Sequence, residues 1–320
     1  MPSAPTSFSC ALCAGTQYRL VVRGQTNRQQ ACGHGEISMA EYACTSRHHG
    51  QYYQVVACRR CQLQALFPLP TATAIEEAYT RVQDDGYVTI EPSREIAFTK
   101  ILHRLSRYTK PPGKLLDVGC YTGVFPLLAE RAGWDAYGVE PSRWATTVAQ
   151  RRLPGKISQG YLAQQAFAEA TFDVITSWDV IEHVTDPRQT CEAMARLLKP
   201  GGWLFLSTMA STAPVVKLLG SRWPWYMPMH LFYFTPKTLS AFLTEAGLVT
   251  QSIQSYPHYT TVQYALWKLE AYLGPVARGL GTVAAKLGLA TKVIKIDLGD
   301  FFLIAAQKPP QPSEAPAKAI

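Results

Sequence analysis

Four cysteines near the start of the chain have the spacing of metal ligands. They form two pairs with two residues inside each pair, Cys10 with Cys13 and Cys58 with Cys61. Two such pairs together supply the four thiolates of one tetrahedral zinc ion. The chain has eight cysteines, and in a chain without a secretion signal they are more often reduced thiols or metal ligands than disulfides. We therefore predict a structural zinc ion on these four side chains.

The segment between the two pairs holds further side chains of metal-ligating type. These are Cys32, His34, Cys44, His48 and His49. They could be alternative ligands or form a second site, and the sequence leaves both options open. The two other cysteines, Cys120 and Cys191, are expected to be packing residues.

Two histidines follow segments that read as buried strands. His183 lies in the sequence Val-Ile-Glu-His-Val, and His230 lies in Met-His-Leu-Phe-Tyr-Phe. Open α/β sheets bind ligands at the carboxyl ends of their strands, where a histidine can act as a general base. The alternative for each is a structural role, such as holding a loop. We predict His183 and His230 as the catalytic residues.

A glycine turn follows the apolar run at residues 114–118. Asp117, Gly119 and Gly123 form the pattern Asp-x-Gly-x-x-x-Gly at the start of a predicted helix. Glycine has no Cβ and tolerates a positive φ, so a ligand can approach the main-chain amides there. Glu140 ends the next predicted strand, where a carboxylate can accept both hydroxyls of a ribose. These features predict a nucleoside-binding site.

This glycine spacing differs from the G-x-G-x-x-G of dinucleotide-binding proteins. It resembles motif I of the class I S-adenosylmethionine-dependent methyltransferases, whose cofactor has no phosphate. The resemblance covers most of residues 114–208, because 172–177 and 197–204 look like the family's fourth strand and the entry to its fifth. The family often has glycine where this chain has Tyr121. That departure implies either a distorted turn or a ring that lines the cleft.

The resemblance also implies roles for individual residues. Glu140 would hold the ribose, residues 160–162 would border the adenine, and Trp178 and Asp179 would flank the methionine portion. The complete set of predicted cofactor-binding residues is Asp117, Gly119, Cys120, Tyr121, Gly123, Glu140, Pro141, Gly160, Tyr161, Trp178 and Asp179. Tyr79 and Tyr87 are further residues that could close over the cofactor.

The elements that must position these residues form an α/β fold. From residue 114 onward, short apolar runs alternate with helical stretches, which predicts parallel strands joined by right-handed crossover helices. We expect a Rossmann-like, seven-stranded methyltransferase sheet with helices on both faces. The expected regions are a zinc-ribbon-like β module in 1–70, a linker and helix in 71–112, the methyltransferase domain in 113–308 and a disordered tail in 309–320.

A helical insertion is expected at residues 259–296, before the last strand. Its leucines and valines recur at alternating spacings of three and four, and Gly274 with Pro275 divides it into two helices. Lysines and an arginine nearby are compatible with peripheral membrane contact. The favoured interpretation is a cap that covers the substrate cleft.

Composition limits the partners only broadly. The 320 residues carry a formal net charge of +8, which favours an acidic partner such as RNA or an anionic membrane surface. No run of five or six basic residues occurs, so a solvated basic surface explains the charge equally well. No uncharged apolar run approaches the roughly 18 residues of a membrane-spanning helix. We expect a cytoplasmic protein.

The leading hypothesis is an S-adenosylmethionine-dependent methyltransferase that acts on a small molecule. The acceptor would be a sugar, a glycan intermediate or a secondary metabolite, methylated at oxygen, nitrogen or carbon. A zinc ribbon ahead of such a domain resembles bacterial sugar and small-molecule methyltransferases. It also resembles zinc-containing ribosomal-RNA methyltransferases, so RNA is the alternative substrate. A third hypothesis is an inactive scaffold protein. The acceptor and the oligomeric state stay open.

Overall fold

The structure is a computed structural model that describes residues 7–24 and 54–310. The five additional candidate ligands between the cysteine pairs, and the predicted disordered tail beyond residue 310, lie outside the described residues.

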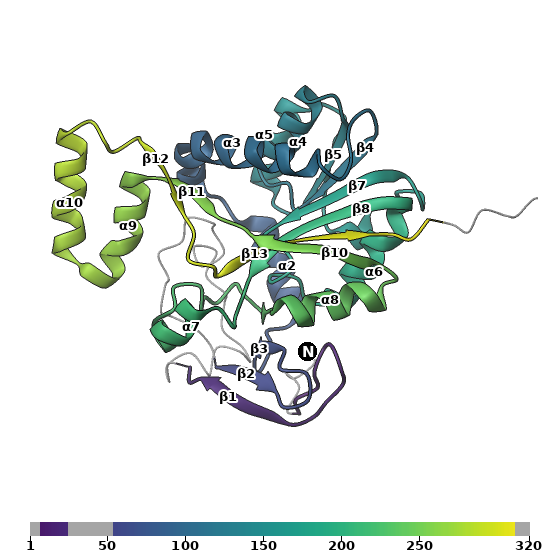
Figure 1. Cartoon of the computed structure of the whole chain (residues 1–320), viewed down its shortest axis with the longest axis horizontal. Coiled ribbons are helices and arrows are strands. Elements are labelled where there is room, and N and C mark those ends of the chain that lie inside the picture. The colour runs from purple at the N-terminus through teal and green to yellow at the C-terminus, as the bar shows by residue number, and fades with distance from the viewer. Residues whose placement is uncertain (1–6, 25–53, 311–320) are drawn as a thin grey trace, which may run out of the picture.

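A seven-stranded sheet forms the centre of the molecule (Figure 1). In spatial order its strands are β10 (Val249–Ser255), β13 (Phe301–Gln307), β8 (Leu198–Met209), β7 (Phe172–Trp178), β4 (Lys114–Val118), β5 (Asp135–Glu140) and β6 (Ile157–Gln159). Only β13 is antiparallel to its neighbours. The chain runs from β4 outward to β6 and returns to the other side of β4 as β7, so the strand order reverses beside β4. The predicted Rossmann-like, seven-stranded sheet is confirmed.

Helices cover both faces of this sheet (Figure 1). One face carries α3 (Asp85–Leu105), α4 (Val124–Arg131) and α5 (Arg143–Arg152), and the other carries α6 (Pro187–Leu197) and α8 (Pro236–Glu245). Side-chain caps start α5, α6 and α8, since the oxygens of Ser142, Asp186 and Thr235 accept backbone N–H groups of the first turns. The shorter helices are α2 (Ala72–Arg81) and α7 (Pro214–Leu219).

The helix α3 begins earlier than the sequence predicted. The hydrophobic pattern predicts a helix that begins at Ser93, directly after Pro92. A start after the proline is expected because proline removes one backbone hydrogen bond and usually ends a helix. In the structure the helix begins at Asp85 and continues through Pro92. The extra turns carry Tyr87 and Ile90 into the core.

The cysteine-rich segment forms a second, four-stranded sheet in the order β1 (Tyr18–Val22), β2 (Val55–Cys58), β3 (Gln64–Leu66) and β9 (Phe232–Tyr233). The fourth strand comes from the C-terminal half of the chain. Arg188 of α6 makes a second contact between this sheet and the rest of the molecule, since its guanidinium donates to the carbonyl of Leu12 at 2.7 Å. One hydrophobic core runs through both sheets. The cysteine-rich sheet therefore packs directly against the large sheet.

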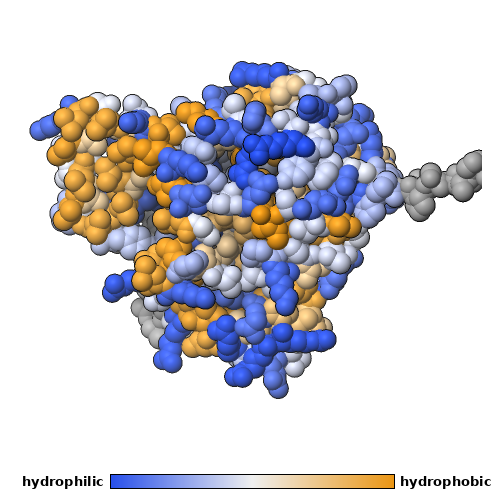
Figure 2. All heavy atoms as spheres, viewed as in Figure 1, coloured by the Kyte–Doolittle hydropathy of each residue, from blue (hydrophilic) through white to orange (hydrophobic). Residues whose placement is uncertain are grey.

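Two helices protrude from the body of the molecule (Figure 1). They are α9 (Val262–Leu273) and α10 (Pro275–Lys286), separated at Gly274 as the sequence predicted. The strands β11 (His258–Thr261) and β12 (Val293–Ile296) pair at their base, which the sequence did not predict. Figure 2 shows apolar side chains gathered on this protrusion. No helix among the described residues is long and apolar enough to cross a membrane.

Candidate active site

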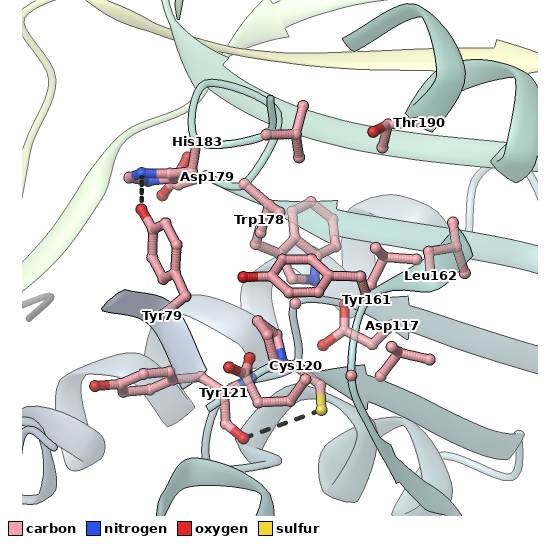
Figure 3. A pocket seen from close by; sticks show the side chains of 18 of the residues that line it. Tyr79, Asp117, Cys120, Tyr121, Tyr161, Leu162, Trp178, Asp179, His183 and Thr190 are labelled. Carbon is pink, nitrogen blue, oxygen red and sulfur yellow. Dashed lines mark hydrogen bonds between the residues drawn. The ribbon is translucent and has the colours of Figure 1, made fainter. Parts of the chain in front are cut away.

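A cavity of about 270 Å³ opens at the carboxyl ends of β4, β5 and β7 (Figure 3). This is the place where the strand order reverses, and open α/β sheets bind their ligands there. Ten of the eleven predicted cofactor residues line the cavity, and the exception is Gly123. No residue of 259–296 lines it. The expected cap over the substrate cleft is therefore not part of this cavity, since α9 and α10 protrude from the body of the molecule (Figure 1).

The two motif glycines have different functions. Gly119 lines the cavity with a φ of +75°, and a Cβ there would lie 2.5 Å from Cγ2 of Val180. Gly123 caps α4 with a φ of +78°, and a Cβ there would lie 2.9 Å from the Cβ of Ala149 on α5. Gly123 therefore allows α4 and α5 to pack closely. Gly123 was predicted to line the cofactor site. In the structure it does not line the cavity, and its role is to allow this packing.

Tyr121 takes the turn position that is often glycine in the family. Its φ is +47°, which is the left-handed conformation that glycine would adopt without strain. The turn is closed by a hydrogen bond from the Gly123 N–H to the Cys120 carbonyl at 2.9 Å. The Tyr121 ring lies 4.4 Å from the ring of Tyr87, and its hydroxyl donates to Asp84 at 3.3 Å. The tyrosine therefore does not disrupt the turn after β4, and the Tyr121 ring lines the cavity.

Two buried carboxyl groups face this cavity. The Glu140 carboxylate accepts backbone N–H groups from Tyr121 at 3.0 Å and Ser142 at 2.8 Å, while Asp117 accepts from the Thr176 hydroxyl at 2.6 Å. Burial raises the pKa of Asp117 to about 8 and that of Glu140 to about 7. Buried carboxyl groups favour a positively charged ligand, because its charge stabilises their ionised form. The sulfonium and ammonium groups of S-adenosylmethionine fit this requirement.

The side of the cavity opposite the sheet is built by α2 and the start of α3. Tyr79 and Tyr87, singled out in the sequence, both line the cavity. The sequence missed Glu76 and Arg94, which come from the same two helices, and Thr190 from the first turn of α6. An amphipathic pattern shows that a helix has a buried face, but it does not reveal which cleft that face closes.

The two predicted catalytic histidines lie next to each other, with ring centroids 4.8 Å apart. His183 lines the cavity, and His230 is buried behind it outside the lining. Burial lowers the pKa of His183 to about 4, so its ring is neutral. Figure 3 shows the His183 ring pointing toward Tyr79, whose hydroxyl lies 2.7 Å from Nδ1. The structure therefore brings His183 to the cleft and places His230 in contact with it.

The four predicted zinc ligands converge at the edge of the small sheet. The Sγ atoms of Cys10 and Cys61 are 3.4 Å apart, and those of Cys13 and Cys58 are 3.5 Å apart. These separations exceed a disulfide bond of about 2.05 Å and approach the roughly 3.8 Å between thiolates that bind one zinc ion with Zn–S bonds of about 2.3 Å. A Cβ at Gly15 would lie within 3.3 Å of two of the sulfurs. The cluster has the donor set and the spacing that zinc requires.

Comparisons with known proteins show which family the chain is similar to. The sequence model of the methyltransferase domain family matches residues 91–253, just over half of the chain. The ubiquinone biosynthesis O-methyltransferase of Thiobacillus denitrificans is 30% identical over 171 residues, which are 49% of this chain and 73% of that protein. The protein of the same name from Paracidovorax citrulli is 36% identical over 107 residues, 31% of this chain and 45% of that protein.

The chain is also similar to solved structures, at lower identity. An S-adenosylmethionine-dependent methyltransferase from Methanosarcina mazei is 20% identical, covers 66% of this chain and 98% of its own, and aligns with a TM-score of 0.46.

The sheet order, the cleft at its reversal point and the two buried carboxyl groups define a class I methyltransferase. The chain belongs to the methyltransferase domain family. The predicted enzyme class, an S-adenosylmethionine-dependent methyltransferase, is confirmed, and the inactive-scaffold hypothesis is set aside.

Proposed function

We propose that this protein methylates a hydroxyl group of a small-molecule acceptor, with S-adenosylmethionine as the methyl donor. The observation that carries the proposal is the position of His183, a neutral polar group in the wall of the cofactor cavity. The relatives named O-methyltransferase support oxygen as the acceptor atom. A sugar, a glycan intermediate and a secondary metabolite are the acceptor classes that follow from the sequence.

The cofactor, when bound, supplies an electrophilic methyl group, so the protein must align the acceptor and exclude water. Glu140 would hold the ribose hydroxyls, and Asp117 would face the positively charged end of the cofactor. Tyr79 and Tyr87 would close the cleft against water. His183, supported by His230, would lie beside the acceptor hydroxyl and activate it for attack.

The four cysteines would hold a structural zinc ion. The support is the convergence of their sulfur atoms and the space that Gly15 leaves beside them. Because β9 follows His230 directly and pairs with β3, the zinc ion would also stabilise the acceptor side of the cleft.

The protruding helices would contact an anionic membrane surface. Exposed apolar side chains lie along both helices, among them Leu273, Val276, Leu280 and Val283, with exposed fractions of 49–64%. Basic side chains such as Lys268 and Lys286 lie on the same two helices. An apolar strip flanked by cations is typical of interfacial helices. A lipid-linked acceptor would be presented to the enzyme at such a surface.

The proposal is tested by incubating the purified protein and S-adenosylmethionine with a panel of phenols, sugars and glycan precursors. Formation of S-adenosylhomocysteine and an acceptor heavier by one methylene group is the expected result. His183→Ala and His230→Ala should lower turnover and leave cofactor affinity nearly intact, whereas His103→Ala on the exposed face of α3 should change neither. If both His183→Ala and His230→Ala turn over like the wild type, the two histidines have a structural role and not a catalytic one.

RNA is the alternative substrate. A protein that binds phosphates along a nucleic acid loses affinity steeply as salt rises. The absence of RNA binding at low salt would remove this alternative, and methylated RNA in place of a methylated small molecule would replace the proposal.

A further inference from the structure

Three polar groups next to the acceptor side of the cleft form a cluster that the methyl-transfer reaction does not by itself explain. One ring nitrogen each of His183 and His230 and one carboxylate oxygen of Glu182 all lie within 4.8 Å of one another. Bonds of about 2.0–2.2 Å from a zinc ion to nitrogen and oxygen place two of its ligand atoms at most about 4.4 Å apart. Small side-chain rotations therefore bring the three groups into contact with one ion.

Backbone carbonyl groups favour the same tautomer in both histidines. Nδ1 of His183 lies 3.0 Å from the carbonyl oxygen of Met229, and Nδ1 of His230 lies 2.6 Å from that of Trp225. A carbonyl oxygen only accepts hydrogen bonds, so each contact forms when Nδ1 carries the proton. The Tyr79 hydroxyl, 2.7 Å from Nδ1 of His183, then accepts from the same N–H group. In a neutral ring this leaves the lone pair on Nε2. Histidines that bind metals have this arrangement, in which the second ring nitrogen donates to a carbonyl or carboxylate.

Glu182 supplies an independent observation. Glu182 is 1% exposed, and neither its Oε2 atom nor the nearby Thr208 hydroxyl makes a hydrogen bond of normal geometry among the described residues. A buried carboxyl group without a partner is costly, and a bound cation removes this cost. The backbone fixes its position, because the Glu182 carbonyl accepts the N–H of Leu231, the residue after His230, at 2.8 Å.

From these observations we infer that Glu182, His183 and His230 bind a divalent transition-metal ion at the acceptor side of the cofactor cavity. Two imidazoles and one carboxylate suit zinc, manganese or iron(II), whereas magnesium prefers oxygen ligands alone. Three protein ligands leave at least one coordination position open, as in catalytic zinc sites. His183 lines the cavity, so an ion bound to it would lie within reach of an acceptor in the cavity.

The role of this ion rests on the proposed function, while its binding does not. A divalent cation that contacts a hydroxyl group lowers the pKa of that group and makes it a better nucleophile. The two histidines then activate the acceptor as ligands of the ion, and the hydroxyl proton leaves to water. The oxygen lone pair forms the new bond to the methyl carbon as the carbon–sulfur bond breaks, and sulfur keeps the electron pair.

The test uses the full chain with its cysteine site loaded with zinc. Cobalt(II), a spectroscopic substitute for zinc, is added, and its absorption is recorded together with the metal content per chain after gel filtration. We expect one ion beyond the zinc ion of the cysteines, with cobalt absorption that lacks the thiolate charge-transfer bands. Magnesium should not compete for this site. No ion beyond that of the cysteines, even at saturating cobalt, would overturn the inference.

The variant Glu182→Gln keeps the shape of the side chain and removes its charge. Cobalt affinity should fall at least about 100-fold, the upper range for loss of a partner that only supports a ligand. His230→Ala should have a similar effect, and His103→Ala should bind cobalt like the wild type. Unchanged affinity in the folded Glu182→Gln and His230→Ala proteins would contradict the site. If cobalt binds as expected and no acceptor is methylated, the proposed function fails and the metal site stands.

Discussion

The backbone N–H of Leu66 donates to the carbonyl of Leu231 at 2.9 Å. Leu66 is the last residue of β3 in the cysteine-rich sheet, and Leu231 follows His230, whose ring contacts that of His183. Phe232 continues this pairing with Ala65. The small sheet is therefore a direct support of the segment that carries His230.

Loss of a zinc ligand should affect turnover more than cofactor binding. Cys61→Ser removes one thiolate of the predicted zinc site, and the β3–β9 pairing beside His230 should loosen as a result. We expect a lower melting temperature and a reduced kcat, with S-adenosylmethionine affinity close to wild type. Calorimetric titration and initial rates measure the two effects. Cys191→Ala removes a buried thiol outside the zinc site and serves as the control. An equal loss of kcat in that variant would show that the loss in Cys61→Ser does not depend on zinc.

Glu140→Gln should weaken S-adenosylmethionine binding. The carboxylate would accept hydrogen bonds from the ribose, and hydrogen bonds to charged groups contribute about 1.5–3 kcal/mol. This corresponds to roughly a 10- to 100-fold increase in Kd, which calorimetric titration detects. Glu169→Gln, an exposed carboxyl group paired with Arg196, should bind the cofactor like the wild type. A Kd within twofold of wild type for Glu140→Gln would remove Glu140 from the cofactor site.

Cofactor affinity should rise with pH between about 6 and 8. Burial raises the pKa of Glu140 to about 7, so the group is largely protonated below that pH and ionised above it. Only the ionised form accepts from both ribose hydroxyls and attracts a cationic ligand. Titrations at several pH values give the Kd profile. In Glu140→Gln the profile should flatten, and an unchanged slope would assign the pH dependence to another group.

The protein without cofactor should lose stability as pH rises through the same window. The pKa values of Asp117 and Glu140 are about 8 and 7 in the folded chain, against 3.8 and 4.5 as ordinary values. Between those limits the folded state binds more protons than the unfolded state, so the free energy of unfolding falls with increasing pH. Denaturant unfolding from pH 5 to 8 measures this. Asp117→Asn should reduce the slope, and a slope equal to that of the wild type would contradict the assignment.

Replacement of Gly123 should destabilise the fold through a steric clash. Gly123→Ala places a Cβ 2.9 Å from Ala149, whereas Gly155→Ala has a similar positive φ of +76° and no heavy atom within 4 Å. The left-handed conformation alone costs about 1–2 kcal/mol for alanine, and overpacking adds about 1–3 kcal/mol at Gly123 only. Denaturant unfolding compares the two variants. Equal losses would mean that α4 and α5 separate easily.

The protruding helices can be tested with lipid vesicles. The double variant Val276→Glu with Leu280→Glu places two charges on the apolar strip and should lose most binding to anionic vesicles in a sedimentation assay. Turnover with a water-soluble acceptor should stay unchanged, since neither residue lines the cavity. Leu20→Glu changes an exposed leucine on the small sheet and should bind vesicles normally. No vesicle binding by the wild type would refute the membrane proposal.

The sequence by itself determined the cofactor corner, because its geometry is local. Asp117 and Glu140 lie on consecutive strands, and Gly119 directly follows the first of them. Parallel pairing brings the ends of such strands to one edge of the sheet. The sequence also predicted that the two cysteine pairs come together, since a spacing of two residues between thiolates suits one tetrahedral ion. The hydrophobic pattern also showed the alternation of strands and helices.

Only the tertiary structure decided which distant segments meet. It separated Gly123 from the cavity, turned the 259–296 helices away from the cleft, and joined β9 to the cysteine-rich sheet. It also brought Glu182 together with His230, which is 48 residues away in the printed sequence. Spacing along a chain specifies a turn or a strand end, but packing of whole elements specifies which side chains converge across a cleft.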